Sequence, residues 1–96
     1  MLFEWDDDKN LQNIAKDGLS FDDASRIFGG FTLDLVDDRF DYGEVREVSI
    51  GMIDGLAVVT VVHTSRDGVC RIISARPATR AERIGYEQAI QRAYGP

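Results

Sequence analysis

A cluster of cationic and hydroxyl side chains surrounds the expected start of the last helix. Arg76, Thr79, Arg80 and Arg83 lie close together in the sequence. Arg80 and Arg83 fall near the positive end of the helix dipole, which disfavours cations. Guanidinium groups, a threonine hydroxyl and free backbone N–H groups together form a site for an anion such as a phosphate. The alternative is that neighbouring carboxylates, Glu82 among them, or the acidic N-terminal half neutralise these arginines.

Two further arginines, Arg46 and Arg71, lie within predicted strands. Arg46 alternates with apolar residues such as Ile50, and on an apolar face a guanidinium needs a carboxylate or a phosphate as partner. Glu44 can point to the same face as Arg46, and Arg71 alternates with Val69 and Ile73. Arginines from adjacent strands could therefore line one groove. The alternative is that these side chains are solvated on edge strands.

Few side chains are suited to proton transfer. His63 alone has an unperturbed pKa near neutral, and it follows the apolar run of the expected central strand. It is either a functional group at a strand end or a polar residue where the strand meets water. Tyr86 is either a core residue with its hydroxyl outward or a proton donor. Cys70 is expected to be a small buried hydrophobic residue.

No motif for a metal ion or another cofactor is present, so none is expected. The acidic runs Asp6-Asp7-Asp8 and Asp37-Asp38 lack the ligand spacing of a calcium loop. A helix cap explains the first run and a solvated loop the second. A single cysteine provides neither an internal disulfide nor a cysteine-rich zinc site.

The formal charge of −6 is unevenly distributed over the 96 residues. Residues 1–44 carry a net −8 and residues 45–96 a net +2. The total opposes nucleic-acid binding by bulk charge, whereas the arginine-rich second half leaves room for a local anion site. The longest apolar run, residues 56–62, is too short to span a membrane, and no signal peptide opens the chain. A cytoplasmic protein is therefore expected.

The helices that would position these residues follow from capping signals. A first helix is capped by Asp6 or Asp7 and ends at Gly18. A second helix begins at Ser20 and ends at Gly29-Gly30, and a capping box formed by Thr79 and Glu82 opens a third that runs to about Tyr94. Helical spacing predicts that the first two helices bury Leu11, Ile14, Ala15, Ala24, Ile27 and Phe28.

The sheet follows from alternation and turn signals. Strands are expected over residues 2–5, 33–36, 45–53, 56–63 and 69–75. Asp54-Gly55 and Asp67-Gly68 form tight turns, which make the strands that they join antiparallel. The predicted fold is α+β, in which two N-terminal helices and a C-terminal helix pack on a three- to four-stranded antiparallel sheet. Residues 1–96 are expected to form one domain.

Four sequence blocks resemble the BrnT toxins of bacterial type II toxin–antitoxin modules. They are Phe3-Glu4-Trp5-Asp6 followed by a lysine, KDGLSFDDA (16–24), GEVREVSIG (43–51) and RIISARPATRAER (71–83) with Tyr86. The last block is the most specific, and the resemblance extends from Leu2 to about Ala89. The chain departs from the family pattern at Asp17, where histidine is usual, and at Pro77, where a basic residue is common.

The resemblance implies a RelE-like fold and a metal-independent endoribonuclease that inhibits translation. The implied partners are RNA and a BrnA-type antitoxin with a ribbon-helix-helix region, through which DNA is contacted indirectly. Metal-free RNA cleavage needs a base, cations for the phosphorane charge and an acid. Glu44 or His63 is the candidate base, and Tyr86 or His63 the candidate acid. The expected catalytic residues are Glu44, Arg46, His63, Arg76, Arg80 and Tyr86, and the expected phosphate-binding residues are Lys16, Arg71, Thr79 and Arg83.

Two other functions are compatible with the sequence. The chain could be a non-catalytic or degenerate toxin-fold module that binds an antitoxin, as the acidic balance and Asp17 suggest. It could also be a toxin with a different target, because some proteins of the RelE fold poison gyrase.

Overall fold

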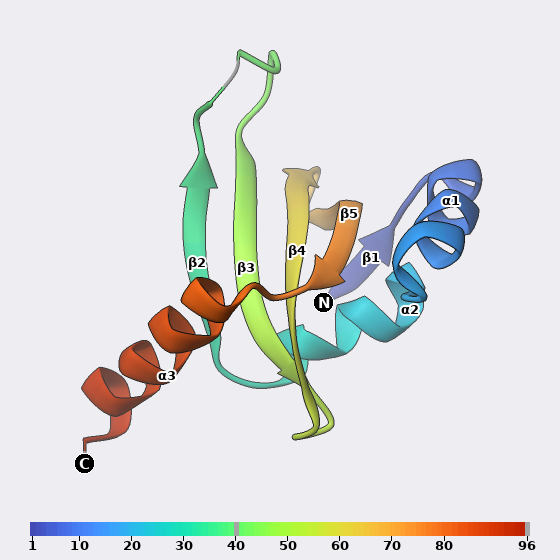
Figure 1. Ribbon diagram of the computed structural model, residues 1–96. Helices are drawn as coiled ribbons and strands as arrows, with labels where there is room; N and C mark the ends of the chain where they lie inside the picture. Colours follow the sequence, from blue (N-terminus) through green and yellow to red (C-terminus); the bar gives the residue numbers. More distant parts are fainter. Residues whose placement is uncertain (40, 96) are drawn as a thin grey trace.

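The computed structural model describes residues 1–39 and 41–95 and confirms the α+β class (Figure 1). The elements in chain order are β1 (Leu2–Glu4), α1 (Asp7–Asp17), α2 (Phe21–Ala24), the 3₁₀ helix η1 (Ser25–Gly29), β2 (Thr32–Asp37), β3 (Arg46–Ile53), β4 (Ala57–Arg66), β5 (Val69–Pro77) and α3 (Arg80–Tyr94). Among these residues, no helix is long and apolar enough to cross a membrane.

The sheet has five strands in the order β1-β5-β4-β3-β2, where three or four were expected. Strands β2 to β5 are antiparallel as predicted, but β1 pairs parallel to β5. A short turn determines the relative direction only of the two strands that it joins. No such turn joins β1 to β5, which is distant in the sequence. The two predicted hairpins are confirmed, because Asp54, Gly55, Asp67 and Gly68 all have positive φ, as type I′ turns require.

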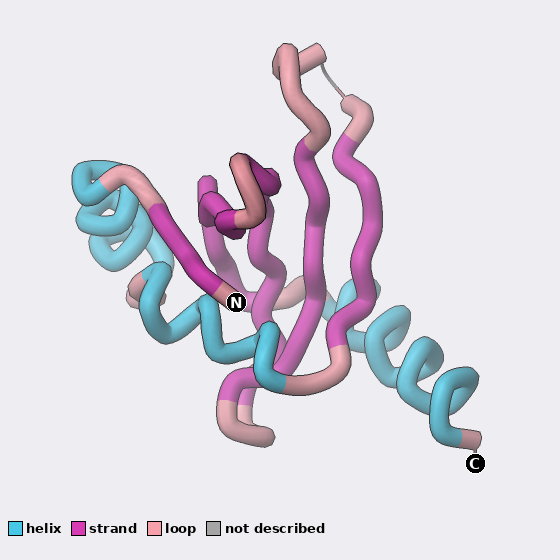
Figure 2. Tube along the Cα trace, turned by 180° about the vertical axis from the view of Figure 1, so that it is seen from behind, coloured by secondary structure: helices cyan, strands magenta, loops and turns pink. Residues whose placement is uncertain are grey.

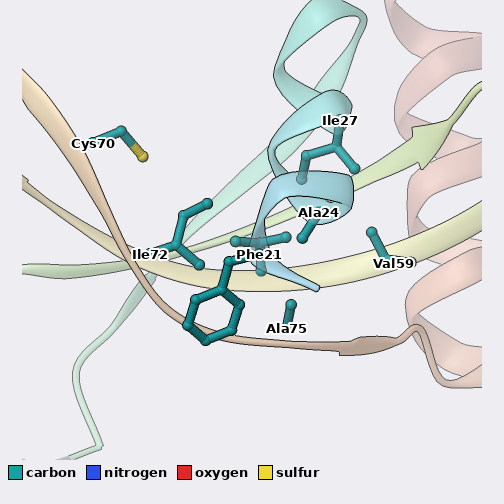
Figure 3. Close-up of a cluster of buried hydrophobic side chains, with 8 residues drawn as sticks. Phe21, Ala24, Ile27, Val59, Cys70, Ile72 and Ala75 are labelled. Atoms are coloured by element: carbon teal, nitrogen blue, oxygen red, sulfur yellow. The ribbon is translucent and has the colours of Figure 1, made fainter. Parts of the chain in front are cut away.

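Helices cover the two faces of the sheet from opposite sides (Figures 1 and 2). We call the face that α2 and η1 cover the α2 face, and the face on which α3 packs the α3 face. On the α2 face, the fully buried Phe21 and Ile27 pack against Val59 and Ile72 (Figure 3). Burial of such side chains contributes about 1.5–3 kcal/mol each, which makes this cluster the larger source of stability.

Helix α1 has the predicted caps, Asp6 and Gly18, but its inward face differs from the expectation. Leu11 is 64% exposed and Ile14 40%, whereas the polar Asn13 is buried. The reason is that α1 lies beside β5 beyond the short strand β1, where a polar group is needed to satisfy the open backbone edge.

Helix α3 covers only part of its face. Tyr86 and Ala78 pack against Ile50 near the start of the helix. From there α3 runs past β2 and away from the sheet (Figure 1). The part of the α3 face nearer the end of β2 and the start of β5 therefore stays open.

We expect alanine at two glycines to have opposite effects on stability. A Cβ at Gly51, on the α2 face, would lie 2.7 Å from the buried Cβ of Ile27, so G51A should lower the free energy of unfolding by about 1–3 kcal/mol. A Cβ at Gly85, inside α3, would meet only Leu33 at 3.8 Å, so G85A should raise it by about 0.5–1 kcal/mol. Urea titration measures both changes, and equal effects would contradict the close packing at Gly51 and the open space at Gly85.

Candidate functional site

A hollow of about 360 Å³ occupies the open part of the α3 face, and we call it the arginine groove. Its lining residues are Leu35, Val36, Asp37, Asp38, Arg39, Val48, Val62, Ser74, Arg76 and Glu82. The floor is one row across four strands, in which Leu35 pairs with Val48, Val48 with Val62 and Val62 with Ser74. Because paired residues share a face, this row presents an apolar floor ending in one hydroxyl.

One wall of the groove consists of Arg76 from β5 and Glu82 from α3. The Arg76 guanidinium donates two hydrogen bonds to the Glu82 carboxylate, at 2.6 and 3.0 Å. Glu82 also accepts from the backbone N–H of Thr79 in the predicted capping box, which is confirmed. Mainly through the bond from Arg76, the pKa of Glu82 falls to about 2. This wall is therefore a fixed ion pair, and Glu82 is a poor proton acceptor.

The opposite wall is the segment that follows β2. The Asp37 carboxylate is buried and accepts hydrogen bonds from the Arg39 Nε at 2.9 Å and from the Tyr42 hydroxyl at 3.2 Å. The bond from Arg39 is the main reason that the pKa of Asp37 falls to about 2. Two arginines, each held by a carboxylate, thus face one apolar floor. Nothing in the sequence marks Arg39 as a site residue except its position among aspartates.

Arg46 and Arg71 lie on the same face as the groove. Arg46 is two residues from Val48 along β3, and its guanidinium lies 3.8 Å from the ring centroid of Tyr42. Its Nε is 3.8 Å from Glu44, which is longer than a hydrogen bond. Arg71 pairs in register with Thr64 and lies 3.8 Å from Glu4.

A β-bulge brings the arginines of β5 onto one face. Residues 71 and 76 would point to opposite sides of a regular strand. In β5, Ile72 pairs with His63 and Ser74 pairs with Val62, so that Ile73 is the extra residue. Arg71 and Arg76 consequently share the α3 face. The regular alternation expected for this strand is interrupted at Ile73, beyond Arg71.

His63 is not part of the groove. It lies on the α2 face within β4, is 8% exposed and meets the ring of Phe28 edge-on. Its Nε2 is 2.7 Å from the Ser49 hydroxyl, which in turn donates to Asp34 at 2.6 Å. The expectation that His63 marks the end of the strand is wrong, because β4 continues to Arg66.

The burial of His63 predicts a pH dependence of stability. Desolvation lowers its pKa below the ordinary 6.5, so the unfolded state binds the proton more tightly. We expect the free energy of unfolding to fall as the pH drops below about 6.5. Asp37 and Glu82 titrate at lower pH and do not contribute to this change. Urea titrations between about pH 7 and 5 on the wild type and on H63Q measure this, and equal pH dependence in both proteins would contradict it.

Three of the predicted site residues, Tyr86, Thr79 and Arg83, have hydrogen-bond partners within the fold, and a fourth, Arg80, is exposed. The buried Tyr86 donates to the backbone carbonyl of Phe31 at 3.1 Å, and burial raises the pKa of its hydroxyl. The Thr79 hydroxyl accepts from the N–H of Glu82 as the helix cap. Arg83 donates to the carbonyl of Ala78, and Arg80 is exposed at the first position of α3.

Lys16 and Glu44 lie in hollows adjoining the groove. Lys16 lines a hollow of about 230 Å³, to which Ser74 also contributes. Glu44, which pairs with Arg66 at 3.2 Å, lines another hollow that shares Asp37 and Arg39 with the groove. Among the residues described, no cluster of three His, Cys, Asp or Glu side chains could hold a metal ion.

Comparison with known proteins identifies the family. The sequence profile of BrnT, the ribonuclease toxin of type II toxin–antitoxin systems, matches residues 5–82. The crystal structure of the Brucella abortus ribonuclease toxin BrnT is similar at a TM-score of 0.62 and 26% identity, over 83% of this chain and 100% of that chain. A search of curated proteins yields no match. The resemblance seen in the sequence blocks is thus confirmed: this chain belongs to the BrnT family of ribonuclease toxins of type II toxin–antitoxin systems, whose partner is an antitoxin.

Proposed function

We propose that this toxin is an endoribonuclease that cleaves RNA in the arginine groove without a metal ion and thereby inhibits translation. The observation that carries the proposal is that Arg39 and Arg76 line one hollow with an apolar floor, while Arg46 and Arg71 lie on the same face of the sheet. Guanidinium groups bind phosphate oxygens in a planar fork, and the apolar floor suits the face of a base.

The reaction would follow the metal-free route of RNA cleavage. The 2′-oxygen of the ribose attacks phosphorus, the bond to the 5′-oxygen breaks, and a 2′,3′-cyclic phosphate is left. Arg76 and Arg39 would stabilise the charge that develops on the phosphate oxygens. Glu44, in the adjoining hollow, remains the candidate for accepting the 2′-proton. His63 and Tyr86 point elsewhere, so in this proposal water supplies the proton to the 5′-oxygen.

The test is cleavage of a single-stranded RNA by purified toxin in the presence of EDTA. We expect cleavage to persist and the products to carry cyclic or 2′-/3′-phosphate ends. Complete loss of activity with EDTA would remove the metal-independent mechanism. Loss of protein synthesis with degraded messenger RNA on expression without antitoxin would support inhibition of translation, whereas arrest with intact RNA would contradict it.

The antitoxin is proposed to be of the BrnA type, with a ribbon-helix-helix DNA-binding region, so that DNA is contacted only through that partner. The support is membership of the family, which implies an antitoxin. Copurification with the product of an adjacent gene of that type, and its suppression of growth arrest, test the assignment. A different class of antitoxin would overturn it.

A second function, binding without catalysis, is supported by the pairing of the groove arginines. Arg76 is held by Glu82 and Arg39 by Asp37, so that neither guanidinium lacks a counter-charge. In that case the groove receives an acidic segment of the antitoxin. A folded toxin that neither cleaves RNA nor arrests growth, yet binds the antitoxin, would favour this function over the first.

A further inference from the structure

The edge of β5 beyond β1 is closed by a helix instead of a strand. Strand β1 pairs with β5 only from Val69 to Arg71. Further along, the side-chain amide of Asn13 in α1 donates to the carbonyl of Ala75 at 2.8 Å and accepts from its N–H at 3.2 Å. Asn13 thereby takes the place of a paired strand and fixes α1 beside the bulge.

This attachment presents both lysines of the chain to one hollow. Lys9 and Lys16 lie on the same side of α1 as Asn13, because residues three, four and seven apart share a helix face. The hollow is lined by Lys9, Gln12, Asn13, Lys16, Ile73 and Ser74. The bulge supplies its inner side through Ile73, the residue that has no partner in β4.

The hollow adjoins the arginine groove. Ser74 lines both, since it ends the floor of the groove and borders the hollow beneath α1. The pKa of Arg76 gives a second sign of proximity, because it is raised mainly by hydrogen bonds to Glu82 and additionally by the charge of Asp17, the last residue of α1. The last turn of α1 is therefore a neighbour of the arginine wall.

The two lysines differ from the arginines in their ion pairing. The arginines of the groove pair with carboxylates at 2.6 to 3.8 Å, whereas across residues 1–39 and 41–95 neither lysine has an ion-pair partner. In a chain of net charge −6, two exposed ammonium groups on one helix face are well placed for an external anion. An ammonium group holds a phosphate as a point charge, without the geometry that a guanidinium imposes.

We propose that Lys9 and Lys16 form a second RNA subsite, which holds the phosphates next to the scissile one as the strand passes over Ser74 onto α1. This inference rests on the proposed cleavage in the arginine groove. Gln12 lies between the lysines and can hydrogen-bond to a ribose hydroxyl or a base edge. The ligand is single-stranded RNA longer than a dinucleotide.

The test compares the double variant K9Q/K16Q with R26Q/R92Q, which removes two positive charges elsewhere. Arg26 pairs with Asp23 and Asp54 away from the groove, and Arg92 is exposed in the last turn of α3. Binding of a non-cleavable 2′-O-methyl RNA of about 12 nucleotides is measured by fluorescence anisotropy at several salt concentrations. Cleavage is measured on a pool of dinucleoside monophosphates, which are too short to reach α1.

We expect K9Q/K16Q to weaken binding of the long RNA about tenfold at low salt and to reduce the salt slope by about 1.4, the value for two lost phosphate contacts on a single strand. Its cleavage of dinucleotides should stay within about twofold of wild type. Long-RNA binding equal to that of R26Q/R92Q would overturn the subsite, and so would loss of antitoxin binding with RNA binding intact. If RNA is not cleaved in the arginine groove, R76A will leave dinucleotide cleavage unchanged. This result distinguishes a wrong cleavage site from a wrong lysine subsite.

Discussion

Replacement of Arg76 by alanine is expected to lower kcat/KM for RNA cleavage by about a hundredfold or more. The guanidinium forms one wall of the groove and is held by Glu82 in a fixed orientation, so it provides preorganised positive charge where the phosphorane develops. Removal of one such donor typically costs about 10²–10³ in rate. The measurement is steady-state cleavage of a fluorescent RNA by R76A and the wild type.

Two further variants show how Arg76 acts. R76K keeps the charge but loses the two-pronged hydrogen bonding, so we expect it to recover only a small part of the rate. R92A, which removes an exposed arginine in the last turn of α3, should retain the full rate. Circular dichroism and the urea midpoint establish that each variant folds. Full activity in a folded R76A would remove the arginine groove as the site of cleavage.

Replacement of Asn13 by alanine is expected to lower the free energy of unfolding by about 2–4 kcal/mol. The buried amide bonds to the carbonyls of Leu19 and Ala75, both at 2.8 Å, and to the N–H of Ala75. Without it, these three backbone groups lose their partner in the interior, and each unsatisfied group costs about 1–3 kcal/mol before water enters. The measurement is urea unfolding followed by fluorescence.

The neighbouring residue provides the control for Asn13. Gln12 is exposed on the same helix, so Q12A should change the free energy of unfolding by no more than about 0.5 kcal/mol. N13D keeps the size of the side chain but sets a carboxylate against two carbonyl oxygens, and we expect it to destabilise at least as strongly as N13A. A loss below about 1 kcal/mol in N13A would contradict the role of this amide as a substitute for a paired strand.

The sequence alone determined the local features of the chain. The caps at Asp6, Ser20 and Thr79 and the turns at Asp54-Gly55 and Asp67-Gly68 lie where they were predicted. Each depends on hydrogen bonds or backbone dihedral angles within about four residues, so the surrounding fold has little influence on it. The motif blocks were equally sufficient for the family, which the comparisons confirm.

Only the tertiary structure decided which side chains meet. Apolar residues lie on both faces of β4, so alternation of polar and apolar residues did not reveal that His63 lies on the α2 face, on the other side of the sheet from Arg46. The bulge at Ile73, which nothing in the sequence indicated, brings Arg71 and Arg76 together. Asn13 became buried because β1 ends early, and Arg39 entered the groove because Asp37 fixes it there. These outcomes depend on contacts between distant segments, whose pairing a local pattern does not specify.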